Sequence, residues 1–324
     1  MPSSYSNLRQ QRAYLFVAVA FACVLVFWLS QTHGHGGVYT VARPEPQSSA
    51  PTRSPPPPAV PTEKPSSQDQ DNAVKEGGDE TFYASDALAA EAPVAAIIET
   101  AITPSLIPVM LHFAAVLGPA WKIILYTLEE GWRLPESQPF RRLVESHGIE
   151  IRFLPPETEF ASSRSVSLFL TRPWLWEQLK SAQHVLLFQL DSMICSRAST
   201  RAEDFFEYDF VGAPIAERYG EGYNGGLSLR NPRFFLEMVQ EADFEQSEAE
   251  FEDQWFYQEA KSRLLAGAEV KLPTKEIAQT FSVESIYYDT PLGYHQPSRW
   301  QEGKMDEIEA WCPEVKMLIG RRSG

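Results

Sequence analysis

The sequence predicts an α/β domain with a doubly wound, mostly parallel sheet over residues 93–324, preceded by one transmembrane helix and a disordered stem. Three observations lead to this prediction. Short β-branched, apolar runs alternate with helical patterns from Val94 to Gln189, which is the order that builds a parallel sheet. Residues 13–30 are apolar and uncharged, and residues 31–92 are rich in proline and polar side chains.

The segment 13–30 is predicted to cross a membrane. Its length lies within the usual range for a transmembrane helix, although it falls short of the typical ~20 apolar residues. Arg9 and Arg12 precede it and no Lys or Arg follows before Arg43, so the positive-inside rule places residues 1–12 in the cytoplasm and the rest across the membrane. A cleaved signal peptide is the alternative, which we disfavour because large apolar residues, rather than small ones, end the run.

The predicted stem, residues 31–92, has a composition that does not support a folded core. Nine of the 25 prolines lie between Pro44 and Pro65, and Ser, Thr, Gln, Gly and charged residues make up most of the remainder. Such a segment cannot bury enough apolar surface to fold, and its prolines favour extended conformations. We expect it to hold the folded domain away from the membrane; a disordered tail without a spacing role is the alternative.

Strands and helices alternate regularly in the first half of the domain. The predicted strands are Val94–Ile98, 122–126, 149–154 and 184–189, and the predicted helices are 103–117, 140–147 and 168–180. The strand 184–189 is almost continuously apolar, as a parallel strand buried on both faces should be. Sheets of this kind bind ligands just beyond the carboxyl ends of their strands, so we expect the site there.

The second half of the domain has a more mixed pattern. The predicted strands are 208–213, 227–230 and 281–287, and the predicted helices are Pro232–Glu241, 251–264 and 304–311. The sequence contains no internal repeat. The sheet is therefore expected to lose its regular parallel order beyond residue 189.

Charge and cysteine content limit the classes of partner. The formal net charge of −15, without a Lys/Arg-rich face, argues against nucleic-acid binding. Of the three cysteines, Cys23 lies in the predicted membrane helix, while Cys195 and Cys312 are far apart in the sequence. We expect these two to be buried free thiols, with a disulfide as the alternative. No Cys/His cluster has the spacing of a zinc site.

A carboxylate follows the buried strand 184–189. Asp191 and the small polar Ser192 come directly after it, in the segment FQLDSMIC. An aspartate at such a strand end can hold a divalent cation that also binds a phosphate. An aspartate that only caps the following turn would explain the residue equally well.

Glycines gather before the strand 227–230. Gly220, Gly222, Gly225 and Gly226 lie within the segment YGEGYNGG. Glycines let the backbone approach a ligand closely, although a structural loop or bulge is the more common explanation. The segment lacks both the GxGxxG dinucleotide motif and the GxxxxGK[ST] phosphate loop, so nucleotide binding of those two kinds is not supported.

Two adjacent acids, Glu252 and Asp253, open the predicted helix 251–264. The helix dipole favours a charged carboxylate at this position, and such a carboxylate can act as general base toward a hydroxyl. Residues 241–259 carry eight acids in total, so surface charge and helix capping are the alternative explanation.

One histidine near the carboxyl end of the domain is a further candidate. His295 lies in the proline- and aromatic-rich segment 287–300, where it could bind a metal or transfer a proton, or simply pack against the aromatic rings. Trp300 could offer an aromatic face to a sugar, or belong to the core.

Taken in order, four segments resemble motifs of metal-dependent nucleotide-sugar glycosyltransferases of the GT-A fold, in particular an uncharacterised glycosyltransferase-like family frequent in fungi. The segments are FQLDSMIC, DFVGAPI with YNGGLSLRN, FEDQWF and PLGYH. The resemblance covers about residues 93–314 and implies a Rossmann-like, mostly parallel sheet of GT-A type. The ordered pair NGGLSLRN and EDQWF is its most specific part.

The resemblance also implies roles for individual residues. Asp191 and His295 would bind Mn²⁺ or Mg²⁺ on the diphosphate of the donor, and Asp253, with Glu252 beside it, would be the catalytic base. The residues expected along the nucleotide sugar are Glu99, Thr100, Gln189, Asp191, Ser192, Asn224, Gly225 and Gly226. The family motif has two carboxylates flanking one residue. Aligning Asp191 with the second of them leaves Gln189 at the first, and aligning Asp191 with the first leaves Met193 at the second.

The function implied by the resemblance is transfer of a sugar from a nucleotide sugar to a hydroxyl of a glycan, protein or lipid. The anchor and stem match the layout of single-pass type II enzymes of the Golgi or another secretory membrane, with the domain in the lumen. A membrane-anchored module that binds a glycan or nucleotide without turnover is the alternative, and a metal-assisted hydrolase is a third hypothesis.

Overall fold

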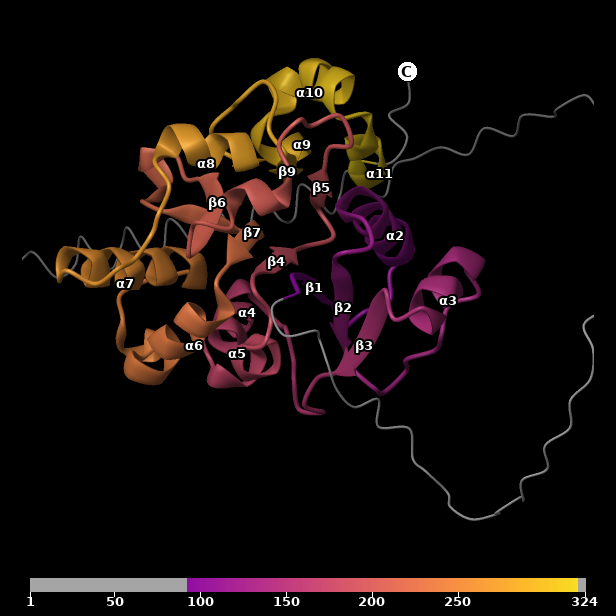
Figure 1. Cartoon of the computed structure of the whole chain (residues 1–324), viewed down its shortest axis with the longest axis horizontal. Helices are drawn as coiled ribbons and strands as arrows, with labels where there is room; N and C mark the ends of the chain where they lie inside the picture. The colour runs from indigo at the N-terminus through magenta and orange to yellow at the C-terminus, as the bar shows by residue number, and fades with distance from the viewer. Residues whose placement is uncertain (1–91, 320–324) are drawn as a thin grey trace, which may run out of the picture. The chain divides into compact units, whose positions relative to one another are not determined.

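A six-stranded sheet forms the centre of residues 92–319, which are the residues that the computed structural model describes (Figure 1). Its strand order is β3-β2-β1-β4-β7-β6. The bounds are Val94–Ile98 for β1, Lys122–Thr127 for β2, Ile149–Phe153 for β3, Val185–Phe188 for β4, Phe210–Pro214 for β6 and Tyr223–Arg230 for β7. β3, β2, β1 and β4 are parallel, whereas β7 runs antiparallel to both of its neighbours.

The predicted α/β class with a largely parallel, Rossmann-like sheet is therefore confirmed, and the regular order ends after β4 as expected. β1, β2 and β4 form because their side chains are almost all apolar, and Val94, Ile124 and Leu186 are fully buried. Helices cover this part of the sheet, so a strand there must be apolar on both faces.

Ten α-helices pack around the strands in the described part of the chain. Their bounds are Leu106–Leu117 for α2, Gln138–Glu145 for α3, Ser163–Leu170 for α4, Pro173–Leu179 for α5, Pro232–Glu241 for α6, Glu252–Leu265 for α7, Lys275–Phe281 for α8, Pro297–Trp300 for α9, Met305–Trp311 for α10 and Lys316–Ile319 for α11. In Figure 1, α2 and α3 lie beside β2 and β3, and α8 lies beside the edge strand β6.

Two predicted elements differ from the structure. The helix expected over 168–180 is two helices, α4 and α5, because Pro173 lacks an N–H and disfavours helical backbone at the residue before it. Of the strand expected over 281–287, only Ser282–Val283 (β8) is extended, and residue 281 ends helix α8.

A second, three-stranded sheet was not predicted. Its order is β5-β9-β8, with β5 at Ser192–Ile194 and β9 at Gly293–His295. β5 and β9 run antiparallel, and Ser192 lies opposite His295. These strands are too short to show a period in the sequence, yet they bring the histidine to the end of β4.

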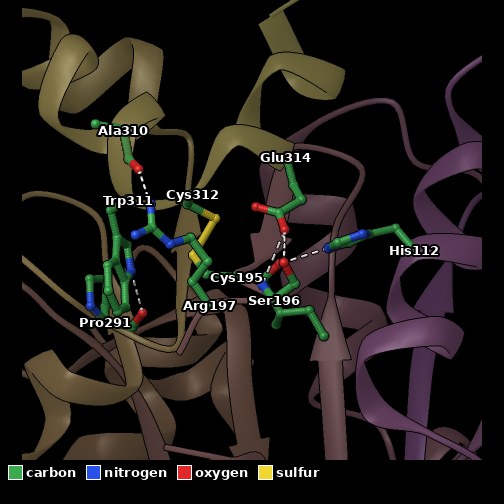
Figure 2. Close-up of a disulfide and its surroundings, with 10 residues drawn as sticks. His112, Cys195, Ser196, Arg197, Pro291, Ala310, Trp311, Cys312 and Glu314 are labelled. Carbon is green, nitrogen blue, oxygen red and sulfur yellow. Dashed lines mark hydrogen bonds between the residues drawn. A yellow bond between two sulfur atoms is a disulfide. The ribbon is translucent and has the colours of Figure 1, made fainter. Parts of the chain in front are cut away.

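A disulfide attaches the carboxyl-terminal helices to β5 (Figure 2). Cys195 and Cys312 are joined, with their Cα atoms 5.0 Å apart, so the alternative of a disulfide holds and the expected free thiols do not. Figure 2 shows the bonds beside it: Arg197 donates to the carbonyl of Ala310 at 2.6 Å, and the Trp311 indole donates to the carbonyl of Pro291 at 3.0 Å.

The predicted cytoplasmic tail (1–12), membrane helix (13–30) and almost all of the stem (31–92) lie outside the described residues. Among residues 92–319, no helix combines the length and the apolar character needed to cross a membrane.

Candidate functional site

The predicted site residues meet at one end of the six-stranded sheet, the end at which the parallel strands β1 and β4 finish. Glu99 and Thr100 follow β1, and Gln189 follows β4, which is the next strand in the sheet. β7 begins at the same end because it runs antiparallel to β4, and the N–H of Gln189 donates to the carbonyl of Gly226 at 3.0 Å. The fold thus gathers three stretches of the chain that lie up to 127 residues apart, from Glu99 to Gly226.

Two cavities open at this end of the sheet. The first, of about 450 Å³, has apolar walls that include Phe160, Phe169 and Leu187, and its polar lining is Glu99, Thr100, Gln189 and Asp191. The second, of about 580 Å³, is lined mostly by polar side chains, among them Asn224, Glu252, Asp253, Glu284 and His295. Val166, Gln189 and Gly225 line both cavities, so the two adjoin.

His295 is held between two carboxylates. Its Nε2 lies 3.3 Å from Oδ1 of Asp191 and 3.1 Å from Oε1 of Gln189, and its Nδ1 lies 3.1 Å from Oε1 of Glu284. Burial lowers the pKa of His295, but the hydrogen bonds with Asp191 and Glu284 outweigh it and raise the pKa to about 9. Burial raises the pKa of Asp191, but the hydrogen bond and charge of His295, together with the hydrogen bond from Gln296, outweigh it and hold the pKa below its ordinary value.

The same atoms fit a divalent cation. Glu284 can accept the Nδ1–H of a neutral His295, which would leave the Nε2 lone pair directed at Asp191 and Gln189. Neighbouring ligands of an octahedral ion at 2.0–2.1 Å lie about 3 Å apart, close to the 3.1 and 3.3 Å that separate Nε2 from the two oxygens. A carboxylate on the second nitrogen is the usual support for a metal-binding histidine.

Residues 92–319 contain no group of three or more His, Cys, Asp and Glu side chains arranged to hold a metal. If Asp191 and His295 held a cation, the amide oxygen of Gln189 would be the third protein donor within reach. Asp191 also accepts a hydrogen bond from the Gln296 side chain at 2.7 Å, which fixes the carboxylate.

Asp253 is buried at the start of α7, in the second cavity. Its Oδ2 accepts the N–H of Gly225 at 2.9 Å, and its Oδ1 accepts the N–H of Gln254 at 2.7 Å. Burial, helped by the negative charge of Glu252, raises the pKa of Asp253 to about 7. The sequence-based expectation that the dipole of α7 favours the charged form is thus outweighed by burial. Glu252 accepts a hydrogen bond from the Ser167 hydroxyl at 2.9 Å.

Glu99 faces the first cavity. Burial, helped by the negative charge of Asp191, raises the pKa of Glu99 to about 7. A carboxyl group of this kind can exist in either protonation state near neutral pH, so it can donate or accept a hydrogen bond to a ligand in the first cavity.

The glycine segment at the start of β7 is shaped by the neighbouring polar groups. The fully buried Ser192 hydroxyl donates to the carbonyl of Gly226 at 2.6 Å, and the side chain of Asn224 accepts the N–H of Gly226 at 2.8 Å. A Cβ added to Gly226 would overlap the imidazole of His295, and one added to Gly225 would lie 2.7 Å from Nη2 of Arg230. Both glycines therefore permit close packing under the site.

Arg230 was not predicted as part of the site. It is fully buried, and its guanidinium lies 5.1–5.7 Å from the ring centroids of four aromatic residues: Trp176, Phe210, Phe235 and Phe256. Its Nε donates to Ser228 at 2.9 Å, and its Nη1 has no hydrogen-bond partner among the described residues. Burial lowers the pKa of Arg230 to about 10, while the charges of Glu252 and Asp253 act in the opposite direction. Its position in the sequence, a charged residue directly after the apolar part of β7, is the feature that could have identified Arg230.

Residues 148–295 match the model of a family described as "Protein of unknown function (DUF5672)", a segment that runs from just before β3 to His295 in β9. Two solved structures of the glycosyltransferase GlyE from Streptococcus pneumoniae TIGR4, one of them the apo form, are 12% identical to this chain, with TM-scores of 0.37 and 0.36. Each comparison covers 63% of this chain and 54% of the other, so the chain spans about half the length of those proteins. Curated proteins gave no match.

Proposed function

We propose that this domain transfers a sugar from a nucleotide-sugar donor to a hydroxyl acceptor. The observation that carries the proposal is the junction of the two cavities at Gln189 and Gly225, with Asp191 and His295 at the junction and Asp253 in the second cavity. The sequence motifs that resemble nucleotide-sugar glycosyltransferases supply these same residues.

The first cavity suits the nucleoside part of a donor. Its aromatic and aliphatic walls can pack on a base, while Glu99 and Thr100 offer hydrogen bonds at the end of β1. The diphosphate would then lie near Gln189 and Asp191, where the cavities adjoin. Asp191, His295 and Gln189 are the residues that would hold Mn²⁺ or Mg²⁺, which when bound supplies positive charge to the departing diphosphate.

The second cavity suits the acceptor. In an inverting reaction the acceptor oxygen forms a bond to the anomeric carbon, the bond from that carbon to the diphosphate breaks, and Asp253 takes the hydroxyl proton. A pKa of about 7 is close to the value at which a carboxylate serves best as a base near neutral pH. If configuration is retained, Asp253 has a different role.

Two observations favour the non-catalytic alternative. Gln189 takes the place of a carboxylate, and His295 is already bonded to Asp191 and Glu284. A binding module would bind the donor but form no product. An assay of donor binding together with an assay of product formation therefore distinguishes the two functions.

The test uses the full chain, purified in detergent, with a panel of nucleotide sugars in the presence and absence of Mn²⁺. We expect one donor to bind by calorimetry and to release nucleoside diphosphate. Asp191→Ala should remove the Mn²⁺-dependent part of binding, and Asp253→Asn should retain binding but lose transfer, while the exposed control Glu248→Gln changes neither. Failure of every nucleotide sugar to bind would refute the proposal.

We also propose that residues 13–30 anchor the protein in a Golgi or other secretory membrane, with the domain in the lumen. The disulfide between Cys195 and Cys312 supports this location, because disulfides persist in oxidising compartments and are rare in the cytosol. Protease protection of the domain in intact microsomes tests the orientation; digestion without detergent would contradict it.

A further inference from the structure

The second cavity contains an aromatic corner that the proposed chemistry does not use. Tyr219 and Trp300 both line this cavity, with their ring centroids 5.0 Å apart and their planes inclined by 67°. Tyr219 is 44% exposed, and Trp300 is half-buried. An arginine guanidinium lies over each ring, Arg218 over Tyr219 and Arg299 over Trp300, each 4.8 Å from the ring centroid. A ligand in the cavity would pack on the part of each ring that its arginine does not cover.

The corner is attached to the same elements that carry the reacting groups. The side chain of Gln254, the residue after Asp253, donates to the carbonyl of Tyr219 at 3.2 Å. Gly220, which follows Tyr219, has a φ of +125°, and a Cβ at this position would collide with the Gln254 side chain. The loop that carries Tyr219 is therefore fitted against the start of α7 and holds the ring near the candidate base.

Trp300 comes from a different element. It lies in α9, which begins two residues after His295, and its backbone N–H donates to the carbonyl of Gln296 at 3.2 Å. Gln296 adopts a left-handed backbone conformation with a φ of 46° and holds the carboxylate of Asp191 through its side chain. The segment that orders the Asp191–His295 pair thus also positions the indole.

We propose that the acceptor is a carbohydrate and that Tyr219 and Trp300 pack against its pyranose ring; this inference rests on the transferase function proposed above. A pyranose has apolar C–H faces and a rim of hydroxyls. The aromatic corner matches the faces, and Asn224, Glu250 and Arg299, which line the same cavity, match the rim.

The lining of the cavity distinguishes among the acceptor classes. A lipid chain needs a wall without ionisable groups, whereas five carboxyl or guanidinium side chains besides His295 line the second cavity: Glu250, Glu252, Asp253, Glu284 and Arg299. Extended peptides commonly bind by pairing with an exposed strand edge. Of the β7 residues that line the cavity, Asn224 is paired with Ala213 of β6, and the carbonyl of Gly226 accepts the N–H of Gln189. A sugar ring needs neither feature.

The test measures donor hydrolysis and transfer separately on the full chain. The acceptor probe is a panel of p-nitrophenyl pyranosides with gluco, galacto, manno and N-acetylglucosamine configurations, and the comparison acceptors are a Ser/Thr peptide and a short-chain polyprenyl phosphate. We expect Tyr219→Ala and Trp300→Ala to raise the KM for the pyranoside about tenfold each, with donor affinity and donor hydrolysis unchanged. Tyr219→Phe should restore most of the lost affinity.

Phe153→Ala is the matched control, because Phe153 is 42% exposed and lies at the end of β3, on the opposite edge strand of the sheet from β6. An unchanged KM in Tyr219→Ala, whose side chain is exposed, would overturn the inference. Transfer to the peptide or the lipid alone, or donor hydrolysis without transfer to any pyranoside, would overturn it as well. Absence of both donor binding and donor hydrolysis would instead remove the transferase function itself.

Discussion

Replacement of Asp253 by Asn should separate the stability of the fold from its activity. Asp253 is 8% exposed, and its burial next to Glu252 raises the pKa from an ordinary 3.8 to about 7. Each tenfold change in proton affinity corresponds to about 1.4 kcal/mol. Ionisation of this carboxyl therefore lowers the free energy of unfolding by about 4 kcal/mol relative to the protonated form. Asn occupies the same space without the charge.

The gain is reduced by a lost hydrogen bond. The carboxylate accepts two backbone N–H groups, from Gly225 and Gln254, and the amide of Asn has only one acceptor oxygen. Asn replaces the protonated carboxyl, so the bond that it loses is one to a neutral group and contributes about 1 kcal/mol, which leaves Asp253→Asn about 3 kcal/mol more stable than the wild type near about pH 8.

The sign of this difference depends on pH. Below an ordinary pKa of 3.8 the carboxyl is protonated in both the folded and the unfolded chain, so its full contribution to stability is present. As the pH rises toward about 7, the unfolded chain loses the proton first and the wild type loses stability, whereas the variant does not. The variant should therefore be the less stable protein near about pH 4 and the more stable one near about pH 8.

Urea unfolding of both proteins between about pH 4 and about pH 8, followed by near-ultraviolet circular dichroism, measures the effect. Transfer activity should fall at least about 100-fold in the variant, because a general base contributes rate accelerations of that order. A stability difference that stays constant over this pH range would refute the argument, since it would mean that Asp253 ionises as an exposed carboxyl does. Glu248→Gln, at an exposed position of the same acidic stretch, should show no pH-dependent difference.

Three further perturbations test neighbouring parts of the structure. Arg230→Met should raise the pH at which the candidate base ionises, because a buried cation that favours the carboxylate is removed; a shift of the pH–rate profile to lower pH would contradict this. Cys312→Ser opens a disulfide that spans 117 residues and should cost about 4–5 kcal/mol in thermal unfolding, with donor binding retained; an unchanged melting temperature would show that the bond is not formed. Gly226→Ala should weaken Mn²⁺-dependent donor binding by displacing His295, whereas Gly303→Ala, with no atom within 4 Å of the added Cβ, should not; equal binding by both variants would contradict the packing argument.

Much of the fold followed from local patterns. β1, β2 and β4 are buried on both faces, so their sequences are almost continuously apolar, and α6 was predicted at the bounds that the structure shows, Pro232–Glu241. Pro173, the first residue of α5, is the signal in the sequence for the break between α4 and α5, which the single helix predicted over 168–180 did not include. Asp191, and Glu252 with Asp253, could be proposed as site residues because each lies at the end of a recognisable element, whereas Gln189 was implied only by the resemblance to glycosyltransferase motifs.

Only the tertiary structure decided how these groups meet. β5 and β9 have three residues each and lie about a hundred residues apart, so no period in the sequence shows that His295 pairs with Asp191. The burial of Arg230 and the pairing of Cys195 with Cys312 depend in the same way on distant segments. The spacing of apolar residues along a helix or strand shows which of its faces is buried, and this spacing depends only on residues close together in the sequence. The charge state of Asp253 and the partners of His295 depend on burial and distances set by the whole fold.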